Sequence, residues 1–447
     1  MRSSRSQLAD CSHVSLSSIP SFNIHSSTSS MSQNGNTLCS YYKKPHKANT
    51  AAWQAINCLR QEHGRVGWDQ FQLRKQVGSG SIGTVYACQI KKPASMEFAH
   101  CKYAMKMVDR RALKANRKYR ADLEKEILRM LDHPFLPTLY AEFDWSHYSC
   151  FVMEYCPGGD LHTVMYRQPT FVLTIPSAKF YAAEVLLALE YLHAMGIIYR
   201  DLKPENVLVQ EDGHIMLSDF DLSVKCDVVP KLLHCNLGSG VTEDKNITNC
   251  MSCFSSISFI KEKRKKSICS TCTTMPQVDD KEDYDVEFWA EPINARSSSF
   301  VGTHEYLAPE MISGLGHGSE VDWWAFGVFL YELLYGKTPF KGENNKSTLK
   351  NILKQPLIFP ETTYSRNAEQ YCEEMEKAND LIRKLVVKNP KKRMGSFWGS
   401  VEIKKHDFFR GVNWSLIRSV EPPQLPATNL QKLNNGHSKA SSYVDSF

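Results

Sequence analysis

The stretch YRDLKPEN, from Tyr199 to Asn206, decides the fold of this 447-residue chain. It matches the motif H-R-D-x-x-x-x-N, with Tyr199 in place of the histidine. The motif serves phosphoryl transfer, which depends on positioning and charge neutralisation more than on covalent chemistry. Asp201 is predicted to orient a substrate hydroxyl and accept its proton, Lys203 to neutralise the transferred phosphate, and Asn206 to bind a metal ion.

A second acidic motif, Asp219-Phe-Asp221, follows 13 residues after Asn206. It stands where protein kinases carry D-F-G, so Asp219 is predicted to hold Mg²⁺ between the β- and γ-phosphates of ATP. Asp221 replaces a glycine that suits positive φ, and aspartate tolerates that conformation better than most residues. We expect the replacement to stiffen the loop and to leave the metal ligands, Asn206 and Asp219, intact.

A glycine-rich stretch, GSGSIGTV, runs from Gly78 to Val85. Alone it is a weak signal, because a simple glycine turn has the same composition. The residues after it favour strand rather than helix, which points to a β-hairpin folded over ATP. The predicted contacts to ATP in this stretch are Val77, Gly78, Ser79, Gly80, Ser81, Ile82, Gly83, Thr84 and Val85.

Lys106 lies inside the apolar stretch Tyr103-Ala-Met-Lys-Met. A lysine buried there without a charged partner is costly, so we predict a pair with Glu124 that holds Lys106 toward the α- and β-phosphates. Glu126 is the rival partner, on another face of the same predicted helix. A surface lysine without such a role is the alternative interpretation.

Two stretches near the end of the predicted catalytic region complete the pattern. Ser299 to Glu310, SFVGTHEYLAPE, supplies the end of an activation segment, with Arg383 predicted as the buried partner of Glu310. Asp322, which opens DWWAFG, is predicted to accept hydrogen bonds from the catalytic-loop backbone. Five signals in this order make chance agreement negligible.

Composition and charge exclude several classes of protein. Lys and Arg number 54 against 48 Asp and Glu, a mild excess of +6 that gives no case for nucleic acid. No apolar run is long enough for a membrane span or a secretory signal, so the 14 cysteines are predicted to be reduced thiols. We expect a monomer in the cytoplasm.

The pattern divides the chain into four parts. Residues 1–67 are Ser-rich and predicted to be disordered, although Thr50 could cap one short helix. The globular region is predicted over 71–409, strand-rich in 71–153 and helical in 157–409. Residues 225–291 show no sustained period and are interpreted as a flexible insertion. Residues 410–447 are expected to form an irregular tail.

From Phe71 onward the sequence resembles eukaryotic protein kinases of the AGC group. The Asp-Phe-Asp motif and the long insertion before Ser299 resemble the plant-specific group VIII, and residues 136–143 and 290–306 look most like its PINOID-like branch. The resemblance implies an α+β, bilobal fold, with a small β-rich lobe, a large helical lobe, and ATP and Mg²⁺ between them. It also implies a non-specific serine/threonine protein kinase.

The family resemblance implies partners as well. It implies phosphorylation of PIN auxin efflux carriers, and so control of polar auxin transport and plant organ development. It implies association with the plasma membrane and activation by the 3-phosphoinositide-dependent protein kinase. Ser299 is the predicted activating phosphosite, where a phosphate would pair with Arg200; Ser297 and Ser298 are rivals.

The same resemblance assigns nucleotide and substrate positions. The hinge would be Glu154-Tyr-Cys156 behind Met153 as gatekeeper, with Glu154, Cys156 and Asp160 at the nucleotide. Acidic residues at the positions that bind Arg upstream of the target serine predict a basophilic enzyme. They are Asp160, Glu205 and Glu332. Ordinary solvated or structural acids are the alternative interpretation.

The insertion and the C-terminus leave alternatives open. Cys250-x-x-Cys253 and Cys269-x-x-Cys272 have a zinc spacing, whereas residues 254–266 run from apolar to basic and favour contact with anionic membrane lipids. A nuclear address or a solvated charge run would also fit the basic residues. The ending Tyr443-Val-Asp-Ser-Phe447 departs from the F-x-x-F of AGC kinases, which leaves its docking open.

Three other functions compete with the main prediction. They are a kinase for other membrane substrates, a pseudokinase scaffold and a lipid-recruited adaptor. Only Asp221 favours the scaffold, and only the insertion favours the adaptor.

Overall fold

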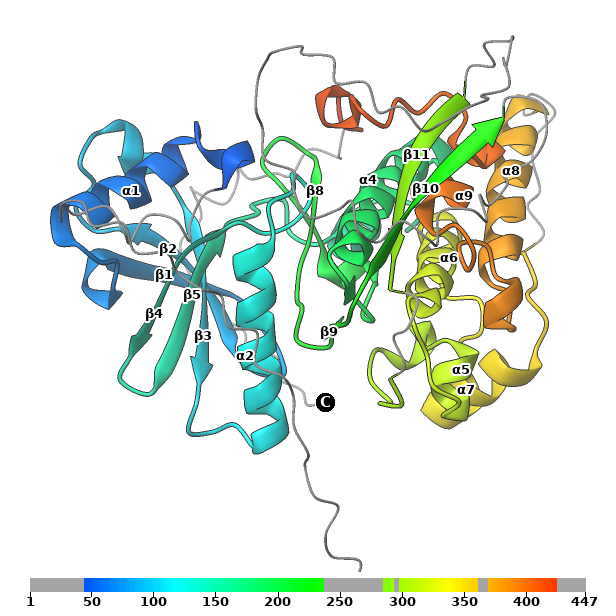
Figure 1. The fold of residues 1–447 in the computed structure, drawn as a ribbon, viewed down its shortest axis with the longest axis horizontal. Helices are drawn as coiled ribbons and strands as arrows, with labels where there is room; N and C mark the ends of the chain where they lie inside the picture. Colours follow the sequence, from blue (N-terminus) through cyan, green and yellow to red (C-terminus); the bar gives the residue numbers. More distant parts are fainter. Residues whose placement is uncertain (1–43, 237–283, 293–296, 361–368, 424–447) are drawn as a thin grey trace, which may run out of the picture. The chain divides into compact units, whose positions relative to one another are not determined.

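A computed structural model describes residues 44–236, 284–292, 297–360 and 369–423 of the chain. The first lobe is built on a five-stranded antiparallel sheet in the order β1-β2-β3-β5-β4, with helix α2 (Ala115–Met130) beside it (Figure 1). Its strands are β1 (Phe71–Ser79), β2 (Thr84–Ile90), β3 (Tyr103–Asp109), β4 (Leu139–Trp145) and β5 (Tyr148–Glu154). Because β3 is central, six of its seven side chains are buried, Lys106 among them.

The second lobe is mainly helical, around two almost wholly apolar helices. These are α4 (Ile175–Ala194) and α6 (Glu320–Tyr335), whose side chains are buried nearly all round, as expected for helices in the centre of a core. The other helices are α3 (Leu161–Tyr166), α5 (Pro309–Ser313), α7 (Asn345–Lys354), α8 (Glu369–Leu385) and α9 (Ser400–Lys404). The two lobes confirm the predicted bilobal kinase fold.

Short elements connect these parts. The paired strands are β6 (Ile197–Ile198) with β9 (Val224–Lys225), and β7 (Val207–Val209) with β8 (Ile215–Leu217). Single turns of 3-10 helix cover Pro45–Lys47, Trp68–Gln70, Glu97–His100, Pro204–Asn206, His304–Tyr306, Pro390–Lys392, Asp407–Phe409 and Ile417–Ser419. Strands β6 and β7 flank the YRDLKPEN stretch and so fix both of its ends.

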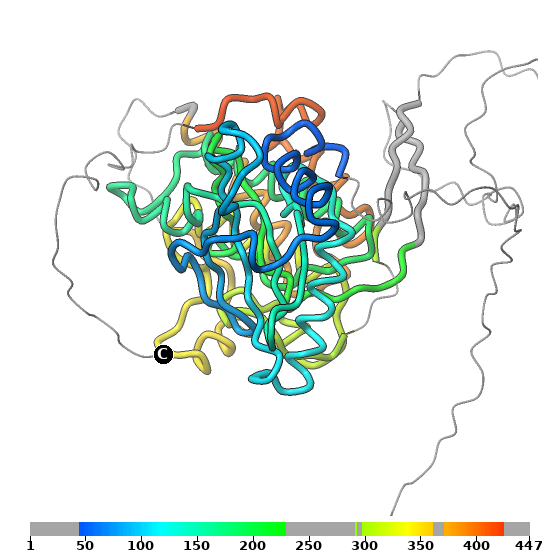
Figure 2. Tube along the Cα trace, turned by 90° about the vertical axis from the view of Figure 1, so that its left-hand side faces the viewer, coloured from blue at the N-terminus to red at the C-terminus, as the bar shows by residue number. Residues whose placement is uncertain are grey.

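Part of the predicted disordered tail is ordered. Residues 44–67 contain helix α1 (Ala51–His63), and the Thr50 side chain caps it by accepting a hydrogen bond from the Trp53 amide. Trp53, Ile56 and Leu59 are buried on one face of α1, which lies against β4 and the sheet (Figure 2). The prediction of disorder is therefore wrong for residues 44–67, because these apolar side chains are buried against the first lobe. Residues 1–43 lie outside the described ranges.

Two lysines ahead of α1 attach this segment to the first lobe. Lys47 Nζ lies 2.6 Å from Glu154 Oε1 at the end of β5, and both side chains are mostly buried. Lys44 Nζ donates to the Arg129 carbonyl at 2.8 Å, within the last turn of α2, where a cation satisfies free carbonyls. Residues 44–63 thus connect α2, β4 and the end of β5.

The ends of the predicted insertion are also ordered. Strands β10 (Val229–Asn236) and β11 (Tyr284–Glu291) form an antiparallel ribbon in which Val229 pairs with Glu291, and β11 contacts α4 (Figure 1). The prediction of one structureless segment over 225–291 is therefore wrong at both ends. The apolar–polar alternation of Tyr284-Asp-Val-Glu-Phe288 was a short strand signal, but the pairing of this strand with one far away in sequence could not be inferred from it. Residues 237–283 lie outside the described ranges.

We expect Trp53→Ala to lower the free energy of unfolding by about 3–5 kcal/mol, because it empties a buried aromatic site between α1 and β4. Gln54→Ala, at an exposed position of the same helix, is the matched control and should leave stability nearly unchanged. Urea unfolding followed by circular dichroism measures both. Equal unfolding midpoints for the two variants would contradict the ordered packing of α1.

Candidate active site

The YRDLKPEN stretch folds into a compact polar cluster. Asn206 Nδ2 donates to Asp201 Oδ2 at 2.9 Å, and Lys203 Nζ lies 3.0 Å from the same oxygen. Asp201 and Asn206 are buried, so the aspartate has its donors in place and little freedom to rotate. The structure thus brings together all three side chains that the motif predicted to act together.

Thr303 joins this cluster, although the sequence analysis gave it no role. Its hydroxyl accepts from Lys203 Nζ at 2.8 Å and donates to Asp201 Oδ1 at 3.2 Å. The residue lies 102 positions after Asp201, so the contact depends on the path of the activation segment. The glycine before it, Gly302, was the one sequence signal that the chain passes close to another segment here. It has a φ of 110°, and a side chain at this position would crowd the Arg200 carbonyl.

Asp322 accepts hydrogen bonds from the backbone of the catalytic loop, as predicted. Its carboxylate accepts from the backbone amides of Tyr199 at 2.8 Å and Arg200 at 2.7 Å. Arg200 has a positive φ of 68°, which is uncommon for a residue with a side chain. The two hydrogen bonds to a fully buried carboxylate stabilise this backbone conformation.

Lys106 pairs with Glu124 rather than with Glu126. Lys106 Nζ lies 2.6 and 2.8 Å from the two oxygens of Glu124, and 3.3 Å from Asp219 Oδ1. Burial alone lowers the pKa of Lys106, but the carboxylates of Glu124 and Asp219 outweigh it and raise that pKa, so the ammonium stays charged. Glu126 binds Lys225 on the surface at 2.6 Å.

The Asp-Phe-Asp motif differs from its predicted geometry. The positive φ, 57°, belongs to Asp219, and Asp221 is not among the described residues with positive φ. Tolerance of that conformation therefore does not explain Asp221. Instead its carboxylate accepts a hydrogen bond from the Ser81 hydroxyl. Burial and the nearby charge of Asp219 raise the pKa of Asp221.

The glycine-rich stretch forms the β1–β2 hairpin, which confirms the predicted strand geometry over a helix. The Gly80 amide donates to the Gly83 carbonyl at 2.9 Å and closes the turn. A Cβ on Gly83 would lie 2.6 Å from the Met107 carbonyl oxygen, so only glycine fits. A Cβ on Gly80 would lie 3.8 Å from Asp219 Oδ2, which places the turn beside the predicted metal ligand.

The predicted nucleotide contacts outside the hairpin lie at the junction of the lobes. Glu154 ends β5 and binds Lys47, and Cys156 follows it in a half-buried position. Asp160 caps α3 by accepting from the Thr163 amide at 2.7 Å, and it bridges to Leu208 of β7. Residues 154–160 therefore lead from the sheet directly to the strand after the catalytic loop.

Two of the three predicted substrate carboxylates lie close together. Glu332 is half-buried and accepts a hydrogen bond from Tyr306, whereas Glu205 is exposed. Burial raises the pKa of Glu332, and the like charges of Glu205 and Glu305 add to this rise. Repulsion of this kind favours binding of a cation. Glu305 was not found from the sequence, because only the folded chain brings it near Glu332.

The predicted partner of Glu310 is wrong. Glu310 binds Arg393 in a two-pronged ion pair at 2.6 and 2.9 Å, with the arginine side chain fully buried over the Trp324 ring. Arg383 instead lies half-exposed on α8 and pairs with Glu376 at 2.7 Å. The turn after Pro390 directs Arg393 inward, a change of direction that sequence spacing does not reveal.

Arg200 reaches the predicted phosphosite. Its Nη1 donates to the hydroxyls of Ser299 at 2.8 Å and Ser297 at 2.9 Å. Burial lowers the pKa of Arg200 to about 10, so the guanidinium is still protonated at neutral pH. Ser298 and Ser299 are both exposed, whereas Ser297 is half-buried. Of the two exposed serines, Ser299 is the one whose hydroxyl accepts a hydrogen bond from Arg200.

The residues around Asp219 fit a nucleotide with a divalent metal ion. Such ions prefer oxygen ligands and commonly take one or two from the protein and others from phosphates. Asp219 offers a carboxylate beside the charged Lys106, and Asn206 offers an amide beside Asp201. Gly80, without a side chain, leaves room next to Asp219.

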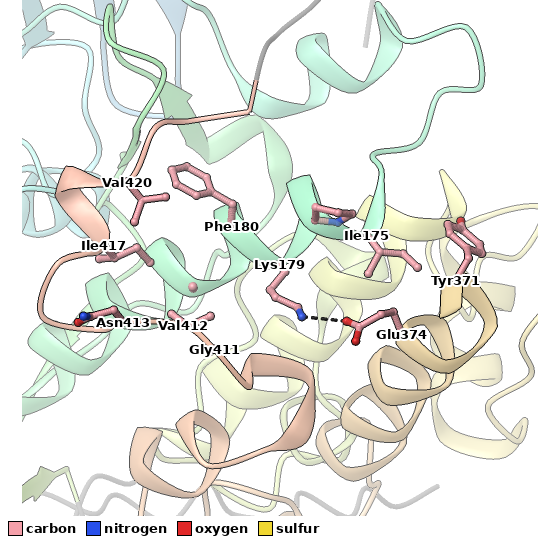
Figure 3. Close-up of a pocket in the computed structure, with 12 residues that line it drawn as sticks. Ile175, Lys179, Phe180, Tyr371, Glu374, Gly411, Val412, Asn413, Ile417 and Val420 are labelled. Atoms are coloured by element: carbon pink, nitrogen blue, oxygen red, sulfur yellow. Dashed lines mark hydrogen bonds and ion pairs between the residues drawn. The ribbon is translucent and has the colours of Figure 1, made fainter. Parts of the chain in front are cut away.

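A separate pocket of about 590 Å³ lies between α4, α8 and residues 411–420 (Figure 3). Its walls are mainly apolar, with Ile175, Phe180 and Val412 among them. Its charged side chains, Lys179 and Glu374, bind each other at 2.9 Å. The pocket contains none of the residues predicted to contact the nucleotide.

Comparison with known proteins is consistent with this site. The family model described as "Protein kinase domain" matches residues 71–236 and 287–409. Protein kinase PINOID 2 of Arabidopsis thaliana is 51% identical, over 94% of this chain and 87% of that protein. Protein kinase PINOID 2 of Oryza sativa subsp. japonica is 52% identical, over 90% and 87%. Serine/threonine-protein kinase AGC1-5 of Arabidopsis thaliana is 47% identical, over 86% and 64%.

We expect Arg393→Met to lower the free energy of unfolding by about 3–5 kcal/mol, because it leaves the Glu310 carboxylate buried without its partner. Arg383→Met breaks an exposed pair and should cost less than about 1 kcal/mol. Parallel denaturant titrations of the two variants measure the difference. A larger loss of unfolding free energy in the Arg383 variant would instead support Arg383 as the partner of Glu310.

Proposed function

The chain belongs to the protein kinase family, among the PINOID-like AGC kinases of plants, and we propose that it phosphorylates PIN auxin efflux carriers with Mg²⁺·ATP as phosphate donor. It is a serine/threonine protein kinase, and protein substrates follow from that class. The contact that most supports an active enzyme is the buried Lys106–Glu124 pair at 2.6 Å, with Asp219 also in reach. Such a lysine–glutamate pair is one of the contacts that active protein kinases require, which supports the proposal.

We assign the residues as follows. Lys106 would hold the α- and β-phosphates, and Asp219 and Asn206 would hold the metal ion, which supplies neutralisation of the phosphate charge. Asp201 would accept the proton of the attacking serine hydroxyl. Lys203 lies 3.0 Å from that carboxylate and would reach the transferred phosphate. The glycine-rich hairpin would cover the phosphates with backbone N–H groups.

The acidic residues at the site support a preference for basic substrates. Glu205 and Glu332 are close enough for like-charge repulsion, and an arginine bound between them would relieve it. Asp160 would contribute from the start of α3 and would also reach the ATP ribose. Control of polar auxin transport and of organ development would follow from action on PIN carriers.

Location and partners are further parts of the proposal. Within the described ranges, no helix combines the length and apolarity that a membrane span requires. We propose a cytoplasmic enzyme that is held at the inner face of the plasma membrane by contact between residues 254–266 and anionic lipids. A fraction of the protein would be in the nucleus. That stretch, the zinc-spaced cysteines and the C-terminal aromatic residues lie outside the described residues.

The decisive assay is phosphate transfer from Mg²⁺·ATP to two substrates. One is a serine peptide with upstream arginines, and the other is the cytosolic loop of a PIN carrier. Both should be phosphorylated, while Asp219→Asn should fall below about one hundredth of the wild-type rate because a metal ligand loses its charge. EDTA should abolish transfer and added Mg²⁺ restore it.

The controls separate the parts of this proposal. A peptide with alanine in place of arginine tests the basic preference. Transfer to the arginine peptide alone would keep the enzyme and reject the PIN assignment. No transfer to either substrate, even with Ser299 phosphorylated, would favour a pseudokinase scaffold.

We expect Ser299→Ala to lower kcat about ten-fold, because Arg200 loses the phosphate that would hold the activation segment. Ser297→Ala is the matched control, since its hydroxyl contacts the same guanidinium. Both variants should first be treated with the 3-phosphoinositide-dependent protein kinase, the proposed activator. Undiminished kcat in Ser299→Ala, or loss in Ser297→Ala alone, would refute Ser299 as the activating site.

A further inference from the structure

A carboxylate from the end of the insertion is buried in the helical lobe. Glu291, the last residue of β11, is 5% exposed, although it lies at the end of a predicted flexible insertion. Its Oε2 lies 2.9 Å from His193 Nδ1, near the end of α4, and this histidine is fully buried. Burial of a charged side chain is costly unless a partner compensates its charge, and His193 is that partner for Glu291.

The contact continues to the catalytic loop. His193 Nε2 lies 2.8 Å from Asp322 Oδ2, the same oxygen that accepts the Tyr199 amide. The other oxygen of Asp322 accepts the Arg200 amide at 2.7 Å. Glu291 is therefore two side chains away from the backbone that positions Asp201.

The surrounding lobe is shaped to receive this carboxylate. Gly399, just before α9, has φ of 54°, and a Cβ there would lie 2.0 Å from Glu291 Oε1. Any residue larger than glycine would therefore push Glu291 out of its place. The Glu291 side chain is therefore packed against the backbone before α9 as well as paired with His193.

Glu291 adds a second carboxylate beside the imidazole of His193. The carboxylates that act on His193 are Glu291 of β11 and Asp322 of α6, and the Trp323 ring packs edge-on against the imidazole. Burial alone lowers the pKa of His193, but the two carboxylates outweigh it and raise that pKa to about 10. The imidazole is then a cation between two anions. The Nδ1–Oε2 contact is an ion pair at 2.9 Å without the alignment of a hydrogen bond, and loss of Glu291 would remove the carboxylate beside Nδ1.

We propose that Glu291 is a positioning residue for catalysis: it holds His193 against Asp322, and through Asp322 it holds the Tyr199–Arg200 backbone behind Asp201. The ribbon at the base of the insertion thereby contributes to the active site of the same chain. The inference needs only that the protein is a kinase, whatever its substrate. It differs from the roles assigned above, because Glu291 touches neither nucleotide nor substrate.

The test uses the full-length protein with Glu291→Gln, which keeps the size of the side chain and removes its charge. We expect kcat for the arginine peptide to fall about ten-fold, while KM for ATP stays within about two-fold, because the loop and not the nucleotide contacts is disturbed. Glu376→Gln, an exposed carboxylate on α8, is the control and should keep wild-type kcat.

A second readout follows His193 itself. In protein labelled with ¹⁵N-histidine, the His193 ring should lose its proton at a lower pH in Glu291→Gln than in the wild type, because one of the two carboxylates that raise its pKa has lost its charge; His193→Gln identifies the signal. A double variant should be no slower than His193→Gln alone, since both changes break one chain of contacts. Unchanged kcat in Glu291→Gln, an unchanged His193 signal, or fully additive losses would each overturn the proposal.

Discussion

The buried carboxylate of Asp322 is the interaction on which the active-site geometry depends. A carboxylate with no exposure must receive donors, and the donors here are two backbone amides and an imidazole. Directly after these amides, Arg200 has a positive φ, which sets the direction of the chain into Asp201. That conformation turns Asp201 toward Asn206 and Lys203, and it sends the Arg200 guanidinium toward the activation segment. One buried charge thus couples the orientation of two functional side chains.

The two lobes are connected by side chains that meet across the site. Lys106 of β3 reaches Asp219, and Ser81 of the glycine-rich turn donates to Asp221. Aspartate at position 221 can accept the hydrogen bond from Ser81, whereas glycine at that position has no side chain to accept it. The Asp-Phe-Asp motif therefore adds a link between the phosphate-covering hairpin and the metal-binding segment. This link gives a physical meaning to the stiffening that the sequence suggested.

Contiguous motifs could be read well from sequence, and long-range partners could not. The Asp201, Lys203 and Asn206 cluster lies within one short stretch, so its geometry is largely local. Helical periodicity was enough to prefer Glu124 over Glu126. By contrast, Arg383 and Arg393 are ten residues apart and equally basic, and only a turn of the chain separates surface from core.

The other differences have a similar origin. The Ser-rich residues at the start of the chain favoured disorder over the whole of 1–67, although a short helix capped by Thr50 was left open and is present as α1. The β10–β11 ribbon pairs residues on either side of a long intervening stretch, which no window along the sequence can detect. Thr303 and Glu305 acquire their contacts only when the activation segment returns to the catalytic loop.

The register of the ribbon bears on how such an insertion can change during evolution. Val229 lies opposite Glu291, so the chain leaves the lobe and returns to it at one place. Once these ends are joined, adding residues beyond Asn236 changes only loop-closure entropy, about 0.6 kcal/mol for each doubling of loop length. Relatives could therefore lengthen or shorten this stretch at little thermodynamic cost. Changes in this stretch could then be selected separately from phosphate transfer, provided the base of the ribbon is kept.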